Sequence, residues 1–388
     1  MKPEISQDVL YIGADDTDLD LFESQYPVPE GISYNSYLIL DDKVAVMDTI
    51  DRRRTEPWLA QLTAALAGRS PDYLVISHLE PDHAANIGLL AERYPEMKLV
   101  GNAKTFAMLP RFFDLDLTGR TVTVAEGESL SLGRHTLTFY MAPMVHWPEV
   151  MVSYESSEKL LFSADAFGKF GALAQDDGDD WACEARRYYF NIVGKYGAQA
   201  QALLKKAAGL DIAKILPLHG PVLEGDLTPY LKLYDLWSSY TPEDRGVTLA
   251  YCSIHGNTAQ AAQLLLAELE AAGEKVESFD LARCDMAEAV EAAFRYDRMI
   301  LAAPTYDGGL FPPMEDFLAH LKSKNFQKRA VWLVENGSWA PLAAKLMREK
   351  LTAMKEITVA ETAVTVASAL KSETEDALRA LVQEVTRH

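Results

Sequence analysis

From residue 247 to residue 388 the chain alternates between short apolar runs and segments with helical spacing. Apolar or β-branched runs begin at Val247, Lys275, Tyr296, Arg329 and Ile357, and helical segments lie at 258–272 and 287–293 and begin again at Pro341 and at Ser372. Strands that alternate with helices at this spacing form a parallel sheet with helices on both faces. The sequence therefore predicts a doubly wound, five-stranded parallel sheet.

The segment 238–251, "SSYTPEDRGVTLAY", joins this regular region to the rest of the chain. Clustered Ser, Thr, Pro and Gly followed by a new β-like run are typical of a domain junction. A chain of 388 residues is also longer than one hydrophobic core usually supports. We therefore place a boundary near Gly246, with one domain at 1–246 and another at 247–388.

The first domain has a less regular pattern. Residues 34–49, "YNSYLILDDKVAVMDT", predict a hairpin that turns at 41–43, and 121–141 contains two more β-rich runs. A helix is expected at 55–66. Hairpins mixed with helices favour an α/β sandwich.

Composition excludes several kinds of function. The chain has 57 acidic and 37 basic residues, a formal net charge of −20, and this field repels the phosphates of nucleic acid. No segment approaches the ~18 apolar residues of a membrane span, and the first 20 residues turn acidic where a secretory signal would turn apolar. We expect a cytoplasmic protein that binds neither nucleic acid nor membranes.

The cysteines exclude one kind of metal site. Cys183, Cys252 and Cys284 are scattered and form no C-x-x-C pair. Neither a disulfide framework nor a thiolate metal site is expected. A metal bound by this chain would use nitrogen and oxygen ligands.

Four polar clusters each follow a β-like run in the first domain. They are "SHLEPDH" (77–83), "MVHWPEV" (144–150), "SADAFG" (163–168) and "PLHGPV" (217–222). Each cluster alone is consistent with an ordinary charged loop, a hydrogen-bonded histidine or a helix cap. Ligands and catalytic groups commonly lie at strand ends, however, and the same placement four times favours a metal site over a solvated loop.

The order H-x-E-x-D-H, then H, D and H, resembles the metallo-β-lactamase fold, an αββα sandwich, as it occurs in flavodiiron proteins. Hydrolases of that fold typically carry H-x-H-x-D-H and bind zinc, whereas Glu80 stands at the second position here. A carboxylate in place of an imidazole makes the site harder and more anionic, which suits iron or manganese.

The resemblance implies a pair of iron ions. His78, Glu80 and His146 would hold one iron, Asp82, His83 and His219 the other, and Asp165 would bridge the two. No catalytic residue beyond these ligands is implied. Trp147 and Tyr26 are expected to be packing aromatics, and Phe170 stands where the family often has histidine, which would alter the pocket wall.

The second domain resembles flavodoxin. Segment 251–262, "YCSIHGNTAQAA", matches the phosphate loop S/T-x-x-x-x-T, although a helix N-cap explains Thr258 equally well. Loops 303–310 and 335–341 follow the third and fourth strands, and no G-x-G-x-x-G occurs at the first turn, so FMN is the implied cofactor. The expected FMN contacts are Ser253, His255, Gly256, Asn257, Thr258, Pro304, Thr305, Tyr306, Asp307, Gly308, Gly309, Asn336, Gly337, Ser338 and Trp339.

The resemblance spans the whole chain and implies a reductase of O2, of NO, or of both. Since no C-x-x-C pair is present, an external rubredoxin or similar carrier is implied as donor, and the family suggests a head-to-tail homodimer or a dimer of dimers. The leading alternative is a zinc hydrolase of the lactamase fold with an accessory flavodoxin domain, against which Glu80 argues. A third is an electron-transfer or scaffold protein with a decayed metal site, against which the seven ligand positions argue.

Overall fold

The computed structural model describes residues 3–175 and 181–388. The chain divides into two compact units, one ending at Asp235 and the other beginning at Leu236. The boundary expected after Gly246 falls inside the first strand of the second unit, and it stays a prediction about where an independent flavodoxin-like domain begins.

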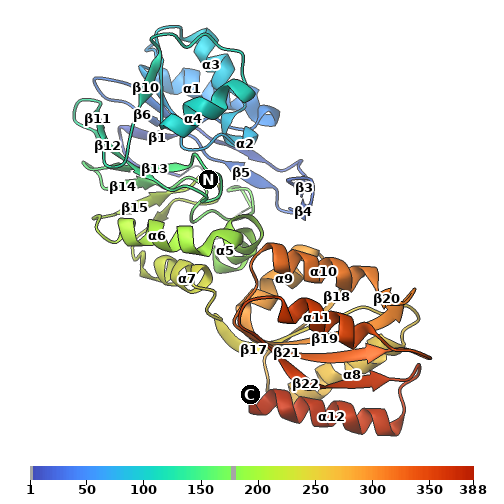
Figure 1. The fold of residues 1–388 in the computed structure, drawn as a ribbon. Helices are drawn as coiled ribbons and strands as arrows, with labels where there is room; N and C mark the ends of the chain where they lie inside the picture. Colours follow the sequence, from blue (N-terminus) through green and yellow to red (C-terminus); the bar gives the residue numbers. More distant parts are fainter. Residues whose placement is uncertain (1–2, 176–180) are drawn as a thin grey trace. The chain divides into compact units, whose positions relative to one another are not determined.

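The first unit is a sandwich of two six-stranded sheets (Figure 1). One sheet contains, in spatial order, β1 (Val9–Tyr11), β6 (Tyr37–Ile39), β7 (Ala45–Met47), β8 (Tyr73–Val75), β9 (Lys98–Gly101) and β10 (Thr121–Thr123). The other contains β11 (Ser129–Ser131), β12 (Thr136–Met141), β13 (Met151–Glu155), β14 (Leu160–Phe162), β15 (Lys214–Leu216) and β16 (Leu223–Glu224). Two small ribbons pair β2 (Ala14–Asp16) with β5 (Ile32–Tyr34) and β3 (Leu21–Phe22) with β4 (Tyr26–Pro27).

Alternate residues of the facing strands make the core between these sheets. Tyr37 and Met47 of the first sheet belong to the same buried cluster as Phe139 and Leu216 of the second. The ring of Tyr37 lies 5.5 Å from that of Phe162 across the sandwich. Apolar contact between the two inner faces therefore fixes the positions of the strand ends.

Helices cover the outer faces of the sandwich (Figure 1). On the first sheet these are α1 (Thr55–Leu66), α3 (Ile87–Arg93) and α4 (Ala103–Met108), with the short α2 (Pro81–Ala84) near the sheet end. On the second they are α5 (Trp181–Tyr188), α6 (Gly197–Ala207) and α7 (Thr228–Ser238). Short turns of other helix types lie at Arg52–Arg54, Leu109–Arg111, Tyr189–Val193 and Gly194–Tyr196. The expected αββα sandwich is confirmed.

Local predictions for this unit were mostly right. β6 and β7 form the predicted hairpin, with Tyr37 opposite Met47 and Ile39 opposite Ala45. The expected helix at 55–66 is α1. Residues 121–141 hold three strands rather than two runs, because β10 pairs with β9 in the first sheet while β11 and β12 form a hairpin in the second.

The second unit is the predicted doubly wound sheet. Its strands, in spatial order, are β18 (Val276–Asp280), β17 (Asp244–Tyr251), β19 (Tyr296–Tyr306), β21 (Arg329–Asn336) and β22 (Ile357–Val366), all parallel. The short β20 (Gly309–Leu310) pairs antiparallel with β19. From β17 the chain goes to β18 on one side and then to β19 on the other side. Such sheets bind ligands at this point, between β17 and β19.

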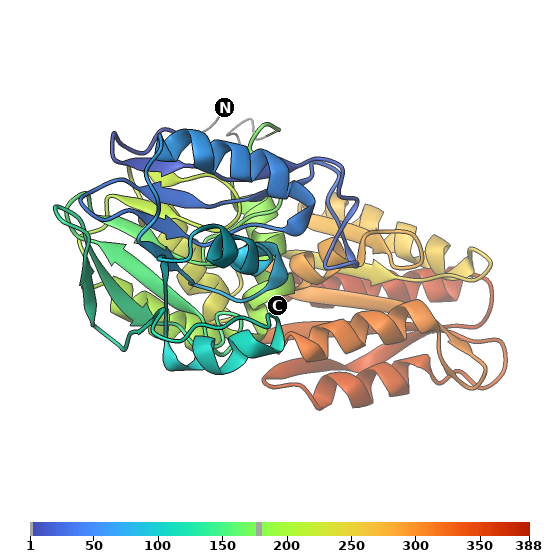
Figure 2. The same cartoon turned by 90° about the horizontal axis from the view of Figure 1, so that it is seen from above.

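Helices lie on both faces of this sheet (Figures 1 and 2). α8 (Asn257–Ala271) and α12 (Ser372–Arg387) cover one face, and α9 (Met286–Arg295), α10 (Pro312–Ser323) and α11 (Ala343–Thr352) cover the other. Leu265 of α8 and Leu381 of α12 share a buried cluster with Ile300 and Val334 of the sheet. No helix within the two described ranges is long and apolar enough to cross a membrane.

We predict that a buried ion pair stabilises the second unit. The side chain of Arg298, fully buried in β19, donates to both oxygens of Glu274 at 3.0 and 2.6 Å and to the carbonyl of Val385 in α12 at 2.9 Å. Removing one partner of such a pair leaves a charge without its counterion. Arg298→Ala should lower the free energy of unfolding, measured with denaturant, by about 3 kcal/mol or more.

The control is Arg283→Ala, because Arg283 makes an exposed pair with Asp280 at 3.3 Å. Its effect on the free energy of unfolding should stay below about 0.5 kcal/mol. Equal effects of the two substitutions would contradict the prediction.

Candidate metal centre and cofactor cavity

The four polar clusters of the first unit do follow strands. His78 follows β8 of the first sheet, while His146, Asp165 and His219 follow β12, β14 and β15 of the second. Ligand atoms from both sheets therefore meet at one edge of the sandwich. All seven residues expected as metal ligands lie in two groups there.

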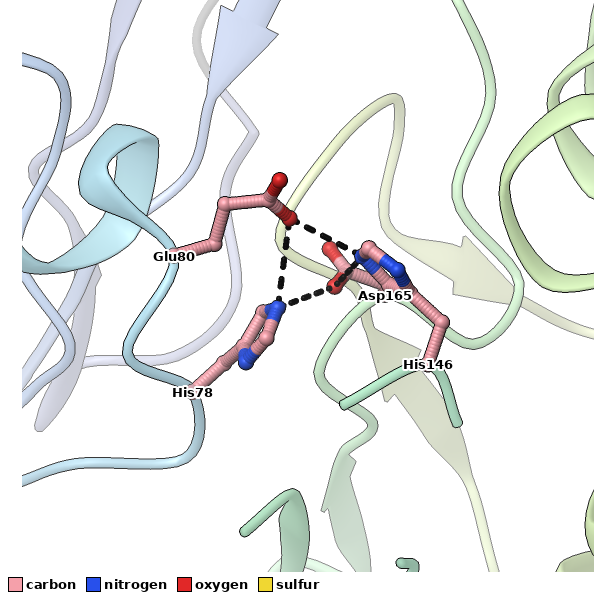
Figure 3. A group of neighbouring side chains, drawn as sticks. All are labelled: His78, Glu80, His146 and Asp165. Carbon is pink, nitrogen blue, oxygen red and sulfur yellow. Dashed lines mark hydrogen bonds and ion pairs between the residues drawn. The ribbon is translucent and has the colours of Figure 1, made fainter. Parts of the chain in front are cut away.

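The first group contains His78, Glu80, His146 and Asp165 (Figure 3). The Nε2 atoms of His146 and His78 lie 2.9 and 3.3 Å from Oε2 of Glu80. The same two atoms lie 3.4 and 3.3 Å from Oδ2 of Asp165. The four ligand atoms are within 4.8 Å of one another, which allows one ion to lie about 2 Å from each of them.

The second group contains Asp82, His83 and His219. The Nε2 atoms of His219 and His83 lie 3.2 and 3.4 Å from Oδ2 of Asp82. They lie 3.7 and 3.2 Å from Oδ1 of Asp165. The two oxygens of Asp165 thus face different groups, as a carboxylate that bridges two ions would.

Two carboxylates of this centre have buried oxygens that are suited to binding a metal ion. Both oxygens of Asp82 and both oxygens of Asp165 are buried, and none of the four has a hydrogen-bond partner among the described residues. A buried anion without donors is costly unless a cation lies beside it. Oxygen and imidazole ligands without thiolates suit iron, manganese or zinc.

The carboxylates and imidazoles of the centre shift one another's pKa values. Burial by itself raises the pKa of Glu80 and of Asp165, but neighbouring imidazoles reverse this and hold both values well below the ordinary range. Burial by itself lowers the pKa of His146, and Asp165 and Glu80 instead raise it to about 9. Glu80 and Asp165 are therefore anionic at neutral pH, and a metal ion would take the place of the proton that His146 carries.

Hydrogen bonds to Nδ1 set the tautomer of two imidazoles. Nδ1 of His78 lies 2.8 Å from Oε1 of Glu149, which also accepts from the backbone N–H of Leu79 at 2.9 Å. Nδ1 of His219 lies 2.7 Å from the carbonyl oxygen of Ser33. A proton on Nδ1 leaves the lone pair of Nε2 for a metal. The sequence did not single out Glu149 or Ser33, although Glu149 lies within the same polar cluster as His146.

Aromatic side chains wall the centre. Trp147 lies 5.1 Å from the His78 ring, and Phe22 lies 5.4 Å from the His219 ring. Phe170 is buried and packs against Tyr188 at 5.1 Å. The hydroxyl of Tyr26 donates to the carbonyl of Asn191 at 3.1 Å. These contacts agree with the packing roles expected for Trp147 and Tyr26, and they exclude water from the His219 side of the centre.

A third group, Asp8, His135 and Glu158, also has metal-like spacing. Nη2 of Arg134 lies 3.0 Å from Oε1 of Glu158 and 2.9 Å from Nε2 of His135, and it pairs with Asp8. A guanidinium thus already supplies the cation, and the group needs no metal.

The second unit contains a cavity of about 610 Å³ at the carboxyl ends of its strands. Every residue expected to contact FMN lines it except Gly256 and Gly309. The cavity also involves residues that the sequence did not single out, namely Ile254, Ala340, Leu342 and Ser368. Ser368 follows the fifth strand, β22, so the rule that identified the other loops would have found it.

One end of the cavity suits a phosphate. Helix α8 begins there with Gly256 as its N-cap, at φ 93°, and no side chain caps the helix. The first backbone N–H groups of α8 are therefore available to an anion beside the hydroxyls of Ser253 and Thr258. The alternative role of Thr258 as N-cap is wrong, because Gly256 holds that position. No Lys or Arg is among the residues that line this cavity.

The cavity also contains side chains that suit an aromatic ring. Tyr306 is 43% exposed and Trp339 is 85% exposed, and both line the cavity. Flat side chains beside backbone of small residues can flank a planar heterocycle. The dimensions and chemistry of this cavity fit FMN.

Comparisons with known proteins agree with both sites. A family profile described as ODP family beta lactamase matches residues 32–220, and one described as Flavodoxin domain matches residues 248–378. The nitric oxide reductase of Moorella thermoacetica is 30% identical over 373 residues, covering 93% of this chain and 92% of that protein. The rubredoxin-oxygen oxidoreductase of Megalodesulfovibrio gigas is 29% identical, covering 88% of this chain and 87% of that protein.

Solved structures show the same fold. The rubredoxin oxygen:oxidoreductase from Desulfovibrio gigas superposes with a TM-score of 0.92 at 27% identity, covering 100% of this chain and 98% of that one. The flavodiiron protein from Giardia intestinalis gives a TM-score of 0.89 at 23% identity, covering 100% of this chain and 97% of that one. The second likeness supports the fold alone.

We predict that Asp165→Ala removes metal from both groups and leaves the flavin in place. Asp165 is the one described side chain whose oxygens face both groups, so its loss should weaken metal binding by at least about 10–100-fold. Metal content by mass spectrometry and FMN content by absorbance measure the two effects.

The control for this prediction is Asp211→Ala. Asp211 is an exposed carboxylate of the same unit that pairs with Lys159. It should change neither content. Full metal content in Asp165→Ala would show that Asp165 is not a ligand.

Proposed function

The chain belongs to the flavodiiron proteins, and we propose that it reduces O2, NO or both with electrons from a rubredoxin or a similar small carrier. The observation that carries this proposal is the pair of metal groups joined by the two oxygens of Asp165. Glu80 in the first group and a flavin cavity in the same chain distinguish it from a hydrolytic centre.

The residues of the first unit have definite roles in this function. His78, Glu80 and His146 would hold one iron, Asp82, His83 and His219 the other, and Asp165 would hold both. When bound, the iron pair supplies reversible redox chemistry at a diatomic ligand, and FMN supplies single-electron transfer from the donor. The aromatic wall keeps bulk water from competing for the metal positions.

The residues of the second unit would bind the flavin. Ser253, Asn257 and Thr258 and the free N–H groups of α8 would take the phosphate. Tyr306 and Trp339 would flank the ring system. Backbone N–H groups of the glycine-containing loops would contact its polar edge.

The alternatives are less well supported. A zinc hydrolase with an accessory flavodoxin domain does not explain Glu80, and the relatives compared above are named as oxidoreductases. A decayed centre does not explain why all seven ligand side chains converge.

Metal analysis with turnover assays tests the function. Protein produced with iron and zinc both available should hold two iron ions per chain. With a reduced rubredoxin as donor, it should consume added O2 or, in a separate anaerobic assay, NO. Two zinc ions with hydrolysis of a thioester or lactam, and without either reductase activity, would reject the proposal. Comparing the rates of O2 and NO reduction at the same donor concentration shows which substrate the protein prefers.

We also propose that the protein works as a head-to-tail homodimer in a reducing compartment, the cytoplasm. Trp339 and Tyr306 are large exposed aromatic side chains at the flavin cavity, and such side chains are enriched at protein interfaces. The family resemblance implies that a second copy covers them. The three cysteines are free, as expected in a reducing environment.

Mixing two inactive variants tests this assembly. Ser253→Asp with Thr258→Asp should lose FMN by charge repulsion, and Asp165→Ala should lose iron. Random pairing makes about half of the dimers mixed, each with one intact flavin cavity and one intact metal centre on different chains. Activity should recover to about a quarter of that of the native protein. No recovery after confirmed subunit exchange would reject transfer between chains.

A further inference from the structure

Three buried imidazoles of the metal centre differ in what their Nδ1 atoms face. Nδ1 of His78 lies 2.8 Å from a carboxylate oxygen of Glu149. Nδ1 of His219 lies 2.7 Å from a neutral backbone carbonyl. Nδ1 of His83 has no hydrogen-bond partner among the described residues. The two metal groups are therefore supported by unequal surroundings.

Glu149 contacts one ligand of the first group and the backbone that leads to the next. Its Oε1 accepts from the His78 ring and from the N–H of Leu79, the peptide between His78 and Glu80. The side chain is fully buried, and its Oε2 has no hydrogen-bond partner in the described part of the chain. Asn102 donates to the backbone carbonyl of Glu149 at 2.6 Å, which fixes the main chain there.

A carboxylate that accepts from Nδ1–H makes the opposite nitrogen of an imidazole a stronger metal ligand. A backbone carbonyl does this more weakly, and an imidazole without a partner gains nothing. Asp165 faces both groups, so each group has four ligand atoms, and the contrast between the groups lies in the partners of their Nδ1 atoms. This contrast favours the first group.

We propose that Glu149 is a positioning residue that makes the two metal positions unequal, so that the position of His78, Glu80 and His146 binds its ion more tightly and fills before that of Asp82, His83 and His219. This proposal rests on the proposed function in one respect: the centre must bind two metal ions.

Titration of the metal-free, FMN-loaded protein with Co²⁺ tests the order of filling. Visible absorbance reports Co²⁺ coordination, and a chelator of known affinity sets the free concentration. The native protein should bind in two separate steps. His219→Ala should keep the tighter step and His146→Ala should lose it, which assigns each step to its group.

Glu149→Gln keeps the shape of the side chain and removes its charge. It should weaken the tighter step by about 10–100-fold and leave the weaker step unchanged. With Fe²⁺ in place of Co²⁺, it should also raise the reduction potential of the tighter iron, because a lost negative charge disfavours the ferric ion. Glu149→Asp keeps the charge and should recover part of the affinity, so that a folding defect in one variant does not decide the result.

Glu155→Gln is the matched control. Oε1 of Glu155 lies 3.1 Å from Nδ1 of His135, and both side chains are fully buried, as are Glu149 and His78, but outside the metal centre. This variant should leave both steps and the potential unchanged. Circular dichroism and thermal melting compare the folding of the two variants.

Three results would overturn the inference. The native protein could bind Co²⁺ in a single step, or Glu149→Gln could bind it in the same two steps as the native protein. Alternatively, Glu149→Gln and Glu155→Gln could weaken both binding steps equally. Two unequal steps in a native protein without O2 or NO reduction would reject the proposed function and leave this inference standing.

Discussion

The cost of burying carboxylates determines how the first unit works. Among the described residues, the four buried oxygens of Asp165 and Asp82 have no hydrogen-bond partner, and the groups that pair with them are imidazoles. Burying an anion costs several kcal/mol unless a cation lies beside it. Metal ions remove that cost, so metal binding and the stability of this edge of the sandwich are linked. Asp165 can stay anionic because, against the effect of burial, the neighbouring imidazoles hold its pKa far below the ordinary value.

The sandwich positions the metal ligands because its packed core fixes the ends of the strands that the ligands follow. β8 belongs to one sheet and β12, β14 and β15 to the other, and the core between them is a single buried cluster. The two oxygens of Asp165 face different groups, so the strand ends must place each ligand beside the right one. Rigid strand ends give each loop a short path to its ligand. Glu149 contributes in a similar way. It lies beside β13, and its side chain holds the loop that follows β8.

The sequence predicted what depends on local pattern and missed what depends on tertiary contact. Strand ends and the hairpin at β6 and β7 follow from apolar runs, and the resemblance to flavodiiron proteins implied all seven metal-directed side chains in the clusters after those runs. Helix α10, which begins with two prolines, was not predicted from the sequence, although proline fits the first turn of a helix. The contact of Glu149 with His78 joins residues 71 positions apart, and no local pattern encodes it. The hydrolase and reductase readings were separated by Glu80 and then by the comparisons.

The two sites have opposite electrostatic requirements. The metal centre gathers three carboxylates and no Lys or Arg among its ligands, and thus attracts cations. The flavin cavity must hold a phosphate, yet it too is lined without Lys or Arg. It relies on N–H groups at the start of α8, which attract an anion without adding a mobile charge. These N–H groups are held in place by the helix and the sheet, so they can bind an anion without a basic side chain in a chain of net charge −20.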